Sequence, residues 1–292
     1  MIETAARPTE VVVAPLAPRS LAQVTLAFTL GGLAVLAIWF TGYVLVIGAA
    51  QEQGDQQRAF ATFRSELSQA TAPLGPTQEG RPVAMIQGPG LHRAVVLEGA
   101  TSQDLQSGPG HRRDTVLPGQ VGVSVLYGKG ATFGAPFKHI SAMRIGDAMQ
   151  VTTGQGSFTY LVTGVRHGGD LAPLPPTGTQ SRLTLVSTAG SGWRSGWAPT
   201  DAVYVDALLD KGVPGTTRRI APIAAEAVLA SSDDALLPLV LWLEALLLVI
   251  GGGVWAWARW GRWQSWLVAS PALVAVLVAT SKAADQLLPN LM

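Results

Sequence analysis

GKGATFGAPF at residues 128–137 and LTLVST at residues 183–188 are the stretches that decide the fold of this chain. Three others precede them, and they read VVLEGA at 95–100, GPGH at 108–111 and TVLPG at 115–119. Most combine an apolar run with glycine or proline, which is typical of strands bounded by tight turns. Because all five occur in one order, the set is far more specific than any single member.

Short apolar runs continue this pattern from Pro82 onward. They cover residues 94–97, 121–126, 149–153, 158–165, 183–186 and 203–205. Turn-forming residues separate the runs, and the Pro-rich stretch 172–176 predicts an exposed loop. This spacing predicts an all-β barrel or sandwich over residues 73–211. After Lys211 the pattern fades into a Gly/Pro/Ala linker over residues 212–235.

The five stretches resemble sortases of the actinobacterial, class E-like type. In that type the corresponding stretches read roughly VVEGT, GPGH, TALPG, GHRTTYGAPF and LTLVTC. The resemblance covers about residues 82–209. It implies a closed β-barrel of roughly eight strands in a domain outside the cytoplasm.

The resemblance also identifies what the chain lacks. A sortase needs the His of GHR, the Cys of LTLVTC and an Arg further on, and those positions hold Lys129, Thr188 and Ala202. The chain contains no cysteine at all. A threonine hydroxyl is a much poorer nucleophile than a thiolate unless a base removes its proton. We therefore expect a degenerate sortase without catalytic residues, transpeptidase activity or a cofactor.

The alternative is an active transpeptidase or hydrolase that uses Thr188 or Ser187 as nucleophile and Lys129 as base. This mechanism requires burial to lower the pKa of Lys129 from about 10.4 by several units. The more ordinary interpretation makes Lys129 a solvated loop residue or a contact with a partner. In that interpretation the two hydroxyls only satisfy backbone groups at a strand end.

Residues after the vacated thiol position are candidates for binding. Trp193 and Trp197 are predicted either to recognise a partner or to fill the disused cleft. Arg194 is the retained arginine in an alternative alignment and would then bind peptide. The histidines predict no metal site, because none has carboxylates or cysteines at ligand spacing. His111, in the GPGH stretch, is predicted to hold the turn by hydrogen bonds.

Composition and hydropathy predict membrane segments. Charged residues make up 13% of the chain and hydrophobic ones 48%. Spans are predicted at 21–50, 236–258 and 266–280, since about 20 apolar residues cross a bilayer. A juxtamembrane helix is predicted at 51–72 and a cytoplasmic turn at 259–265. A cleaved signal peptide is the alternative for the first span, although its apolar run exceeds the usual 7–15 residues.

The positive charges predict the orientation of these spans. Arg7 and Arg19 precede the first span, and Arg259 and Arg262 lie in the turn between the other two. Positive charge favours the cytoplasmic side. A three-pass protein of the cytoplasmic membrane follows, with tail 1–20 inside and the main domain and the tail 281–292 outside.

Polar and small residues in the second span predict a membrane partner. Glu244 is the single charged residue inside a predicted span, and a carboxylate there usually faces protein. Gly251 and Gly252 would let another helix approach closely. We expect an integral membrane protein or envelope lipoprotein as partner, for example in an exporter or envelope-assembly complex. An extended peptide in the barrel cleft is a second candidate. The net charge of +1 gives no reason to expect nucleic acid.

Overall fold

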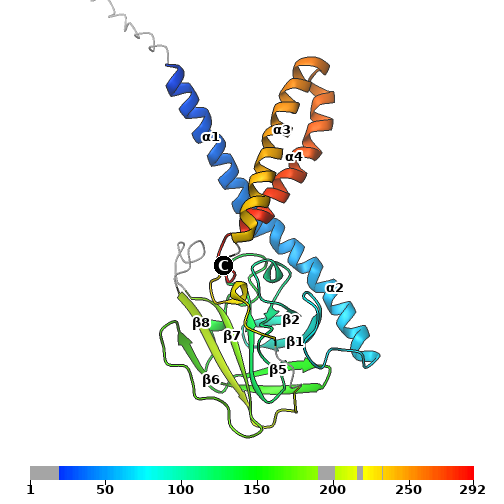
Figure 1. Ribbon diagram of the computed structural model, residues 1–292, viewed down its shortest axis with the longest axis vertical. Coiled ribbons are helices and arrows are strands. Elements are labelled where there is room, and N and C mark those ends of the chain that lie inside the picture. Colours follow the sequence, from blue (N-terminus) through cyan, green and yellow to red (C-terminus); the bar gives the residue numbers. More distant parts are fainter. Residues whose placement is uncertain (1–19, 190–200, 216–219, 232) are drawn as a thin grey trace, which may run out of the picture. The chain divides into compact units, whose positions relative to one another are not determined.

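The computed structural model describes residues 20–189, 201–215, 220–231 and 233–292. Its strands form a closed barrel in the order β1-β2-β3-β4-β7-β8-β6-β5, which confirms the predicted barrel (Figure 1). They are β1 Pro82–Gly88, β2 Leu91–Glu98, β3 Gly110–His111, β4 Gly122–Tyr127, β5 Ala148–Thr153, β6 Gly156–His167, β7 Ser181–Ala189 and β8 Asp201–Leu209. Five of the six apolar runs of the sequence fall within strands, and the run 121–126 begins one residue before β4.

Strand pairing places β7 between β4 and β8. β4 and β7 are parallel, with Tyr127 opposite Val186. A parallel pair needs a long crossover connection, and here β5 and β6 supply it. β8 returns antiparallel to β7, with Ala202 opposite Thr188. The end of β4, the end of β7 and the start of β8 therefore meet at one end of the barrel.

Side chains alternate between the two faces of these strands, as the pleat requires. Val203 and Val205 of β8 point into the main interior core, together with Leu183 and Leu185 of β7. The opposite face of β4, β7 and β8 carries a second apolar cluster. It contains Ala100, Leu105, Val125, Tyr127, Val186, Ala202 and Leu291. That outer face has to be covered by other parts of the chain.

One continuous helical stretch precedes the barrel: α1 Leu21–Gly42, a π-helical turn Tyr43–Ile47 and α2 Gly48–Ser68. Figure 1 shows α2 beside β1 and β2. Ala59 and Phe63 of α2 are buried there in a third apolar cluster with residues of β2. The periodic apolar residues of α2 thus bury one face on the barrel wall.

The juxtamembrane helix ends earlier than the predicted residue 72. Its last residue is Ser68, and Ala70 then adopts a left-handed φ of 55°. The Thr71 N–H donates to the Glu66 carbonyl at 2.9 Å. A left-handed residue followed by such a bond is a common way to end a helix, so Ala70 rather than the later prolines sets the boundary.

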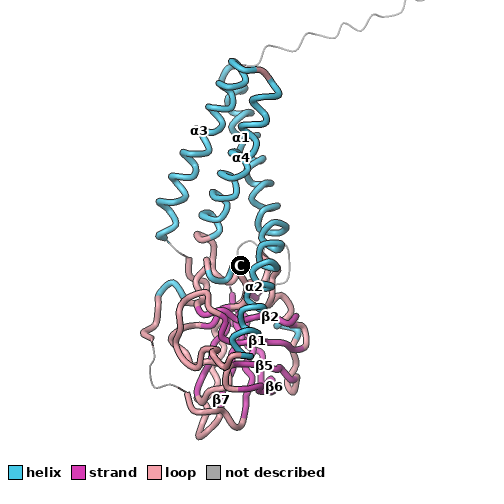
Figure 2. The backbone as a smooth tube through the Cα atoms, turned by 90° about the vertical axis from the view of Figure 1, so that its right-hand side faces the viewer, coloured by secondary structure: helices cyan, strands magenta, loops and turns pink. Residues whose placement is uncertain are grey.

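Two long helices, α3 Leu236–Trp260 and α4 Arg262–Asp285, form a hairpin (Figure 2). The turn between them is Gly261, whose φ of 97° favours glycine. The turn predicted over 259–265 is therefore too long. The helix predicted over 266–280 is correspondingly longer, because both ends continue the helical backbone.

Three helical stretches among the described residues are long and apolar enough to cross a membrane. They are Leu21–Ser68, Leu236–Trp260 and Arg262–Asp285, with mean hydropathy of 2.2, 2.1 and 1.7 in their most apolar windows. The first of them includes α2, which is polar and packs on the barrel. The apolar helix α1 lies within residues 21–50, and that this segment spans a membrane stays a prediction.

The segments around the hairpin pack onto the barrel. In the predicted linker 212–235, Glu226 is buried, and Val228 and Leu229 lie against the outer apolar cluster. After α4 the chain returns to the barrel, and Figures 1 and 2 both mark the C-terminus there. Residues 286–292 are therefore not a free tail, which the sequence did not predict.

Candidate functional site

The three positions that correspond to the catalytic residues of sortases lie together at one end of the barrel. Lys129 follows the end of β4 by two residues, and Thr188 pairs with Ala202 across β7 and β8. Gly130 approaches β7 so closely that a Cβ atom would collide with Thr188 Oγ1. The fold thus brings together Lys129 from the loop after β4, Thr188 from β7 and Ala202 from β8.

Lys129 is fully buried, so the expectation of a solvated loop lysine is wrong. Its Nζ lies 3.4 Å from Asp285 Oδ2, at the end of α4, and 5.1 Å from the centre of the Phe133 ring. Burial lowers the pKa of Lys129, and the neighbouring Asp285 carboxylate opposes this shift only in part. The lysine is buried because the C-terminal residues cover it.

Residues 290–292 lie against the same end of the barrel. The Gly130 N–H donates to the Leu291 carbonyl at 3.0 Å, and Thr132 Oγ1 donates to the Met292 carbonyl at 2.6 Å. Asn290 Nδ2 donates to the Ala100 carbonyl at 3.2 Å. The Leu291 side chain fills the outer apolar cluster and is fully buried. The chain itself therefore occupies this site.

Neither the Thr188 hydroxyl, at the position of the sortase thiol, nor the neighbouring Ser187 hydroxyl bonds Lys129. Ser187 Oγ is buried and has no hydrogen-bond partner among the described residues. Thr188 is half-buried beside Gly130. Nζ of Lys129 bonds Asp285 instead of either hydroxyl. A general base must lie within hydrogen-bond reach of the proton it removes, and this arrangement does not provide that contact.

Three predicted binding residues lie outside the described residues. Trp193, Arg194 and Trp197 fall within 190–200. Whether the tryptophans recognise a partner therefore stays a prediction. Leu291 and its neighbours fill the end of the barrel near Lys129. The sequence did not predict this, because residues 290–292 carry no local pattern that indicates docking.

A groove continues from this end along the outer face of β4, β7 and β8. It encloses about 200 Å³. Its lining includes Tyr127 of β4, Val186 of β7 and Tyr204 of β8, together with Pro173 from the proline-rich loop. This loop is exposed over 171–175, as the sequence predicts. The groove is shaped by strands on one side and a loop on the other, which suits an extended chain.

Three arginines line the groove, and sequence reasoning missed all of them. Arg166 Nε donates to Asp206 Oδ2 at 2.7 Å, and its guanidinium lies 4.1 Å from the centre of the Tyr204 ring. Arg182 donates to the Pro173 carbonyl at 3.2 Å, and Arg112 bonds a neighbouring aspartate. The spread of these arginines over 71 sequence positions (112 to 182) hides the cluster from motif analysis.

His111 is structural, as predicted. Its Nδ1 lies 2.9 Å from Glu98 Oε2, and its Nε2 lies 2.9 Å from the Val116 carbonyl. Both side chains are about 1% exposed. The pair joins β2 and β3 to the following loop, and neither residue faces the groove.

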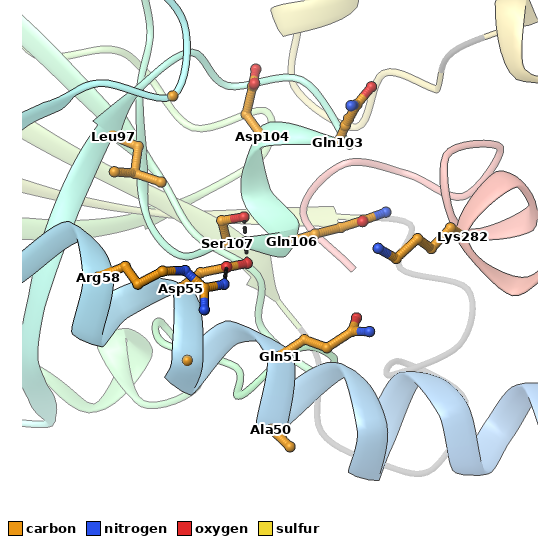
Figure 3. A pocket seen from close by; sticks show the side chains of 12 residues that line it. Ala50, Gln51, Asp55, Arg58, Leu97, Gln103, Asp104, Gln106, Ser107 and Lys282 are labelled. Carbon is orange, nitrogen blue, oxygen red and sulfur yellow. Dashed lines mark hydrogen bonds and ion pairs between the residues drawn. The ribbon is translucent and has the colours of Figure 1, made fainter. Parts of the chain in front are cut away.

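A separate polar cavity has a volume of about 570 Å³, and Figure 3 shows side chains that line it. Gln51 and Asp55 of α2, Gln106 of a short turn and Lys282 of α4 line it. Gln106 Nε2 donates to Asp285 Oδ2 at 2.8 Å. One residue that lines this cavity therefore bonds the carboxylate that pairs with Lys129.

Three carboxylates, of Glu79, Asp104 and Glu226, lie within 4.8 Å of one another. Arg113 forms ion pairs with both Glu79 and Glu226. Its guanidinium supplies the positive charge that a metal ion would otherwise bring. The cluster thus fits an ion-pair network that attaches residue 226 to the barrel, and no metal is assigned to it.

The predicted membrane-contact residues lie on α3. Glu244 is exposed on the helix, and a Cβ atom on Gly251 or Gly252 would meet nothing within 4 Å. A Cβ atom on Gly253 would instead lie 3.5 Å from Cβ of Ala269 in α4. The hairpin contact therefore uses Gly253, and the face of Glu244, Gly251 and Gly252 is open in the single chain.

Comparison with known proteins agrees with this fold. Residues 86–190 match the family model of the sortase domain. The barrel region is therefore similar to a sortase domain. This match spans strands β2 to β7 and includes Lys129 and Thr188. None of the curated proteins compared with the chain matches it.

Several solved sortase structures are similar to this chain. A sortase D5 transpeptidase from Clostridium perfringens is 21% identical over 55% of this chain and 98% of that one, with a TM-score of 0.43. The SrtA sortase from Actinomyces oris is 25% identical over 47% and 86%, with a TM-score of 0.41. A mutant of sortase E from Streptomyces avermitilis is 25% identical over 47% and 93%, with a TM-score of 0.37.

Proposed function

We propose that this protein is a catalytically inactive, class E-like sortase of the cytoplasmic membrane whose barrel binds or scaffolds a partner. The observation that carries the proposal is the buried Lys129–Asp285 pair. It engages Lys129, the only ionisable side chain among the three positions that correspond to sortase catalytic residues. Among the described residues, the Ser187 hydroxyl has no hydrogen-bond partner, and Lys129 bonds Asp285 rather than Ser187 or Thr188. Acyl transfer needs both a nucleophile and a base aligned with it.

The barrel retains features suited to binding. Its outer groove is lined by aromatic side chains and by arginines, which recognise carboxylates through paired hydrogen bonds. An extended peptide could lie along β4, β7 and β8. The three apolar helices would anchor the barrel, and the arginine distribution favours an outside location for it.

A membrane partner is proposed for the open face of α3. An exposed carboxylate at Glu244 is costly in hydrocarbon unless protein or water meets it. The neighbouring Gly251 and Gly252 leave room for a close helix contact. We propose an integral membrane protein or envelope lipoprotein as that partner, and the protein as a subunit of its complex.

Affinity purification tests the subunit role. The tagged full chain is extracted from native membranes in mild detergent, and the proteins that remain bound are identified by mass spectrometry. A stoichiometric membrane partner is the expected result. A chain that purifies alone would contradict the subunit role.

A working transpeptidase or hydrolase is the second candidate. Two observations favour it: burial lowers the pKa of Lys129, as a catalytic base requires, and the buried Ser187 hydroxyl has no hydrogen-bond partner among the residues that the structure describes. The full chain would be incubated with a sorting-signal peptide and an amine acceptor. Turnover that disappears in Thr188→Ala, Ser187→Ala or Lys129→Ala would establish this candidate and overturn our proposal.

A further inference from the structure

The C-terminal segment, residues 285–292, is held on the barrel in the way a peptide ligand is held. Two backbone carbonyls, of Leu291 and Met292, accept hydrogen bonds from Gly130 N–H and Thr132 Oγ1. The Asn290 N–H donates to the Ala230 carbonyl at 2.9 Å. Backbone contacts of this kind bind any extended chain, while side-chain pockets select among them.

Three side chains of the segment supply the selectivity. Leu291 is buried in the outer apolar cluster beside Tyr127 and Val186. Asn290 Nδ2 donates to the carbonyls of Ala100 and Ala227 at 3.2 and 3.0 Å. The third is Asp285, whose carboxylate faces Lys129. The site is thus shaped for a carboxylate, an amide and an aliphatic side chain in sequence.

The fit of the segment is incomplete. Asp285 Oδ1 and Asn290 Oδ1 are buried without a hydrogen-bond partner among the described residues, and so is Ser187 Oγ of the barrel. The Asp285–Lys129 contact is long for an ion pair. Buried polar atoms that stay unpaired cost stability. A ligand that satisfied them would therefore compete effectively with the segment.

Displacement of the segment would also release the end of the membrane hairpin. Asp285 is the last residue of α4, and its carbonyl accepts a bond from Ser102 Oγ at 3.3 Å. Gln106 bonds the same residue through its side chain. These contacts join α4 to the barrel at the place where the groove ends. Occupancy of the site that residues 290–292 cover and attachment of α4 to the barrel are therefore coupled.

We propose that residues 285–292 are a resident ligand of the barrel, displaced by an extended peptide of the same chemistry from a partner. This peptide carries an acidic residue for Lys129 and an amide and an aliphatic residue for the sites of Asn290 and Leu291. The inference rests on the proposed binding function and specifies its ligand class and its regulation. A barrel with the segment in place is closed, and one with the segment displaced is open and loosened from α4.

Thiol labelling of a single cysteine tests this directly, because the natural chain has none. Leu291→Cys is introduced into the full chain, purified in detergent, and its reaction with a maleimide is timed. We expect slow labelling, and at least about tenfold faster labelling when Lys129→Met leaves Asp285 buried and unpaired. Adding Asp285→Leu to that variant should restore slow labelling.

A second experiment tests whether a free peptide displaces the segment. It adds a synthetic peptide of residues 285–292, DQLLPNLM, in excess. This peptide should accelerate labelling of Leu291→Cys several-fold, and a scrambled peptide should not. Leu174→Cys, at an exposed loop position, sets the unprotected rate. Leu126→Cys, in the interior core, should stay protected throughout and shows that the barrel remains folded.

Two results would overturn the inference. Leu291→Cys that labels as fast as Leu174→Cys in the otherwise natural chain would show that the segment does not dock. A rate unchanged by excess peptide would show that it is not displaceable. Peptide turnover, in contrast, would refute the inactive-barrel proposal without changing these labelling rates, so the two failures are distinguishable.

Discussion

Lys129 and Asp285 form a buried ion pair with poor geometry. Neither side chain is more than about 1% exposed, and the charged atoms lie 3.4 Å apart. Removing one partner of such a pair leaves the other charge buried without a counter-charge, whereas replacing both partners with apolar residues is often neutral or stabilising. The pair therefore fixes the position of the C-terminal segment but adds little to the net free energy of unfolding.

Lys129→Met is expected to destabilise the folded protein by about 3–5 kcal/mol, because Asp285 is left buried without its cation. The double variant Lys129→Met, Asp285→Leu should recover most of this loss. Thermal unfolding of the full chain in detergent measures both. Lys211→Met, at an exposed lysine, is the matched control and should change stability by less than about 0.5 kcal/mol.

A double variant as unstable as the single one would contradict this account of the pair. It would mean that the loss comes from packing of the lysine stem rather than from the unpaired carboxylate.

Gly130 is required by close approach rather than by its own backbone angle. A Cβ atom there would collide with Thr188 Oγ1 and press on Ser187 Oγ. Gly130→Ala should therefore destabilise the protein by about 1–3 kcal/mol through overpacking. Combining it with Thr188→Ala should recover part of the loss in the same unfolding assay. No recovery would show that the collision is relieved elsewhere.

At the scale of elements, α2 is the best test of how the helical stretch is fixed to the barrel. Phe63 is 1% exposed in the cluster with Val95 and Leu97, while Phe60 on the same helix is 36% exposed. Phe63→Ala should cost about 3–5 kcal/mol. Phe60→Ala, the control, should cost far less, and equal losses would argue that α2 does not pack as described.

Gln56 adds a polar contact to this interface. Its side-chain amide pairs with both backbone groups of Val95, accepting at 2.7 Å and donating at 3.0 Å. The amide thus continues the hydrogen-bond ladder beyond the edge of β2. This use of glutamine in a Gln-rich stretch was not predictable, because it depends on the distance between α2 and β2.

The sequence indicated six of the eight described strands, but it did not indicate the C-terminal residues that cover the site. Alternating and apolar runs are local patterns that indicate which residues of a strand are buried. They therefore indicated β2, β4, β5, β6, β7 and β8. β3 has only two residues and carries no such pattern. The Lys129–Asp285 contact joins residues 156 positions apart. Single-sequence periodicity contains no information on a contact of that range.

At the scale of the whole molecule, the membrane partner is tested on α3. Glu244→Leu removes the carboxylate without shortening the apolar stretch. If this carboxylate meets a partner helix, recovery of that partner in affinity purification should fall at least about fivefold. Trp242→Leu, at another exposed position of α3, is the control and should retain more. Equal recovery in Glu244→Leu and the natural chain would contradict this contact.

The C-terminal segment joins the apolar hairpin and the barrel. Asp285, Leu291 and Met292 bond residues 129–132 in the loop after β4. The Leu291 side chain also packs in the cluster that contains Tyr127 of β4 and Val186 of β7. An occupied site also has a consequence for any assay of activity. A covered site would block peptide whether or not the residues beneath it were competent.

The most direct test of the central claim is therefore peptide turnover with the site uncovered. Leu291→Asp places a charge in the apolar cluster and expels the segment without altering Lys129, Ser187 or Thr188. The full natural chain and this variant are incubated with a sorting-signal peptide and an amine acceptor, and product is followed by mass spectrometry. Our account predicts no product above background from either. Turnover by Leu291→Asp that is lost on adding Thr188→Ala or Ser187→Ala would contradict it.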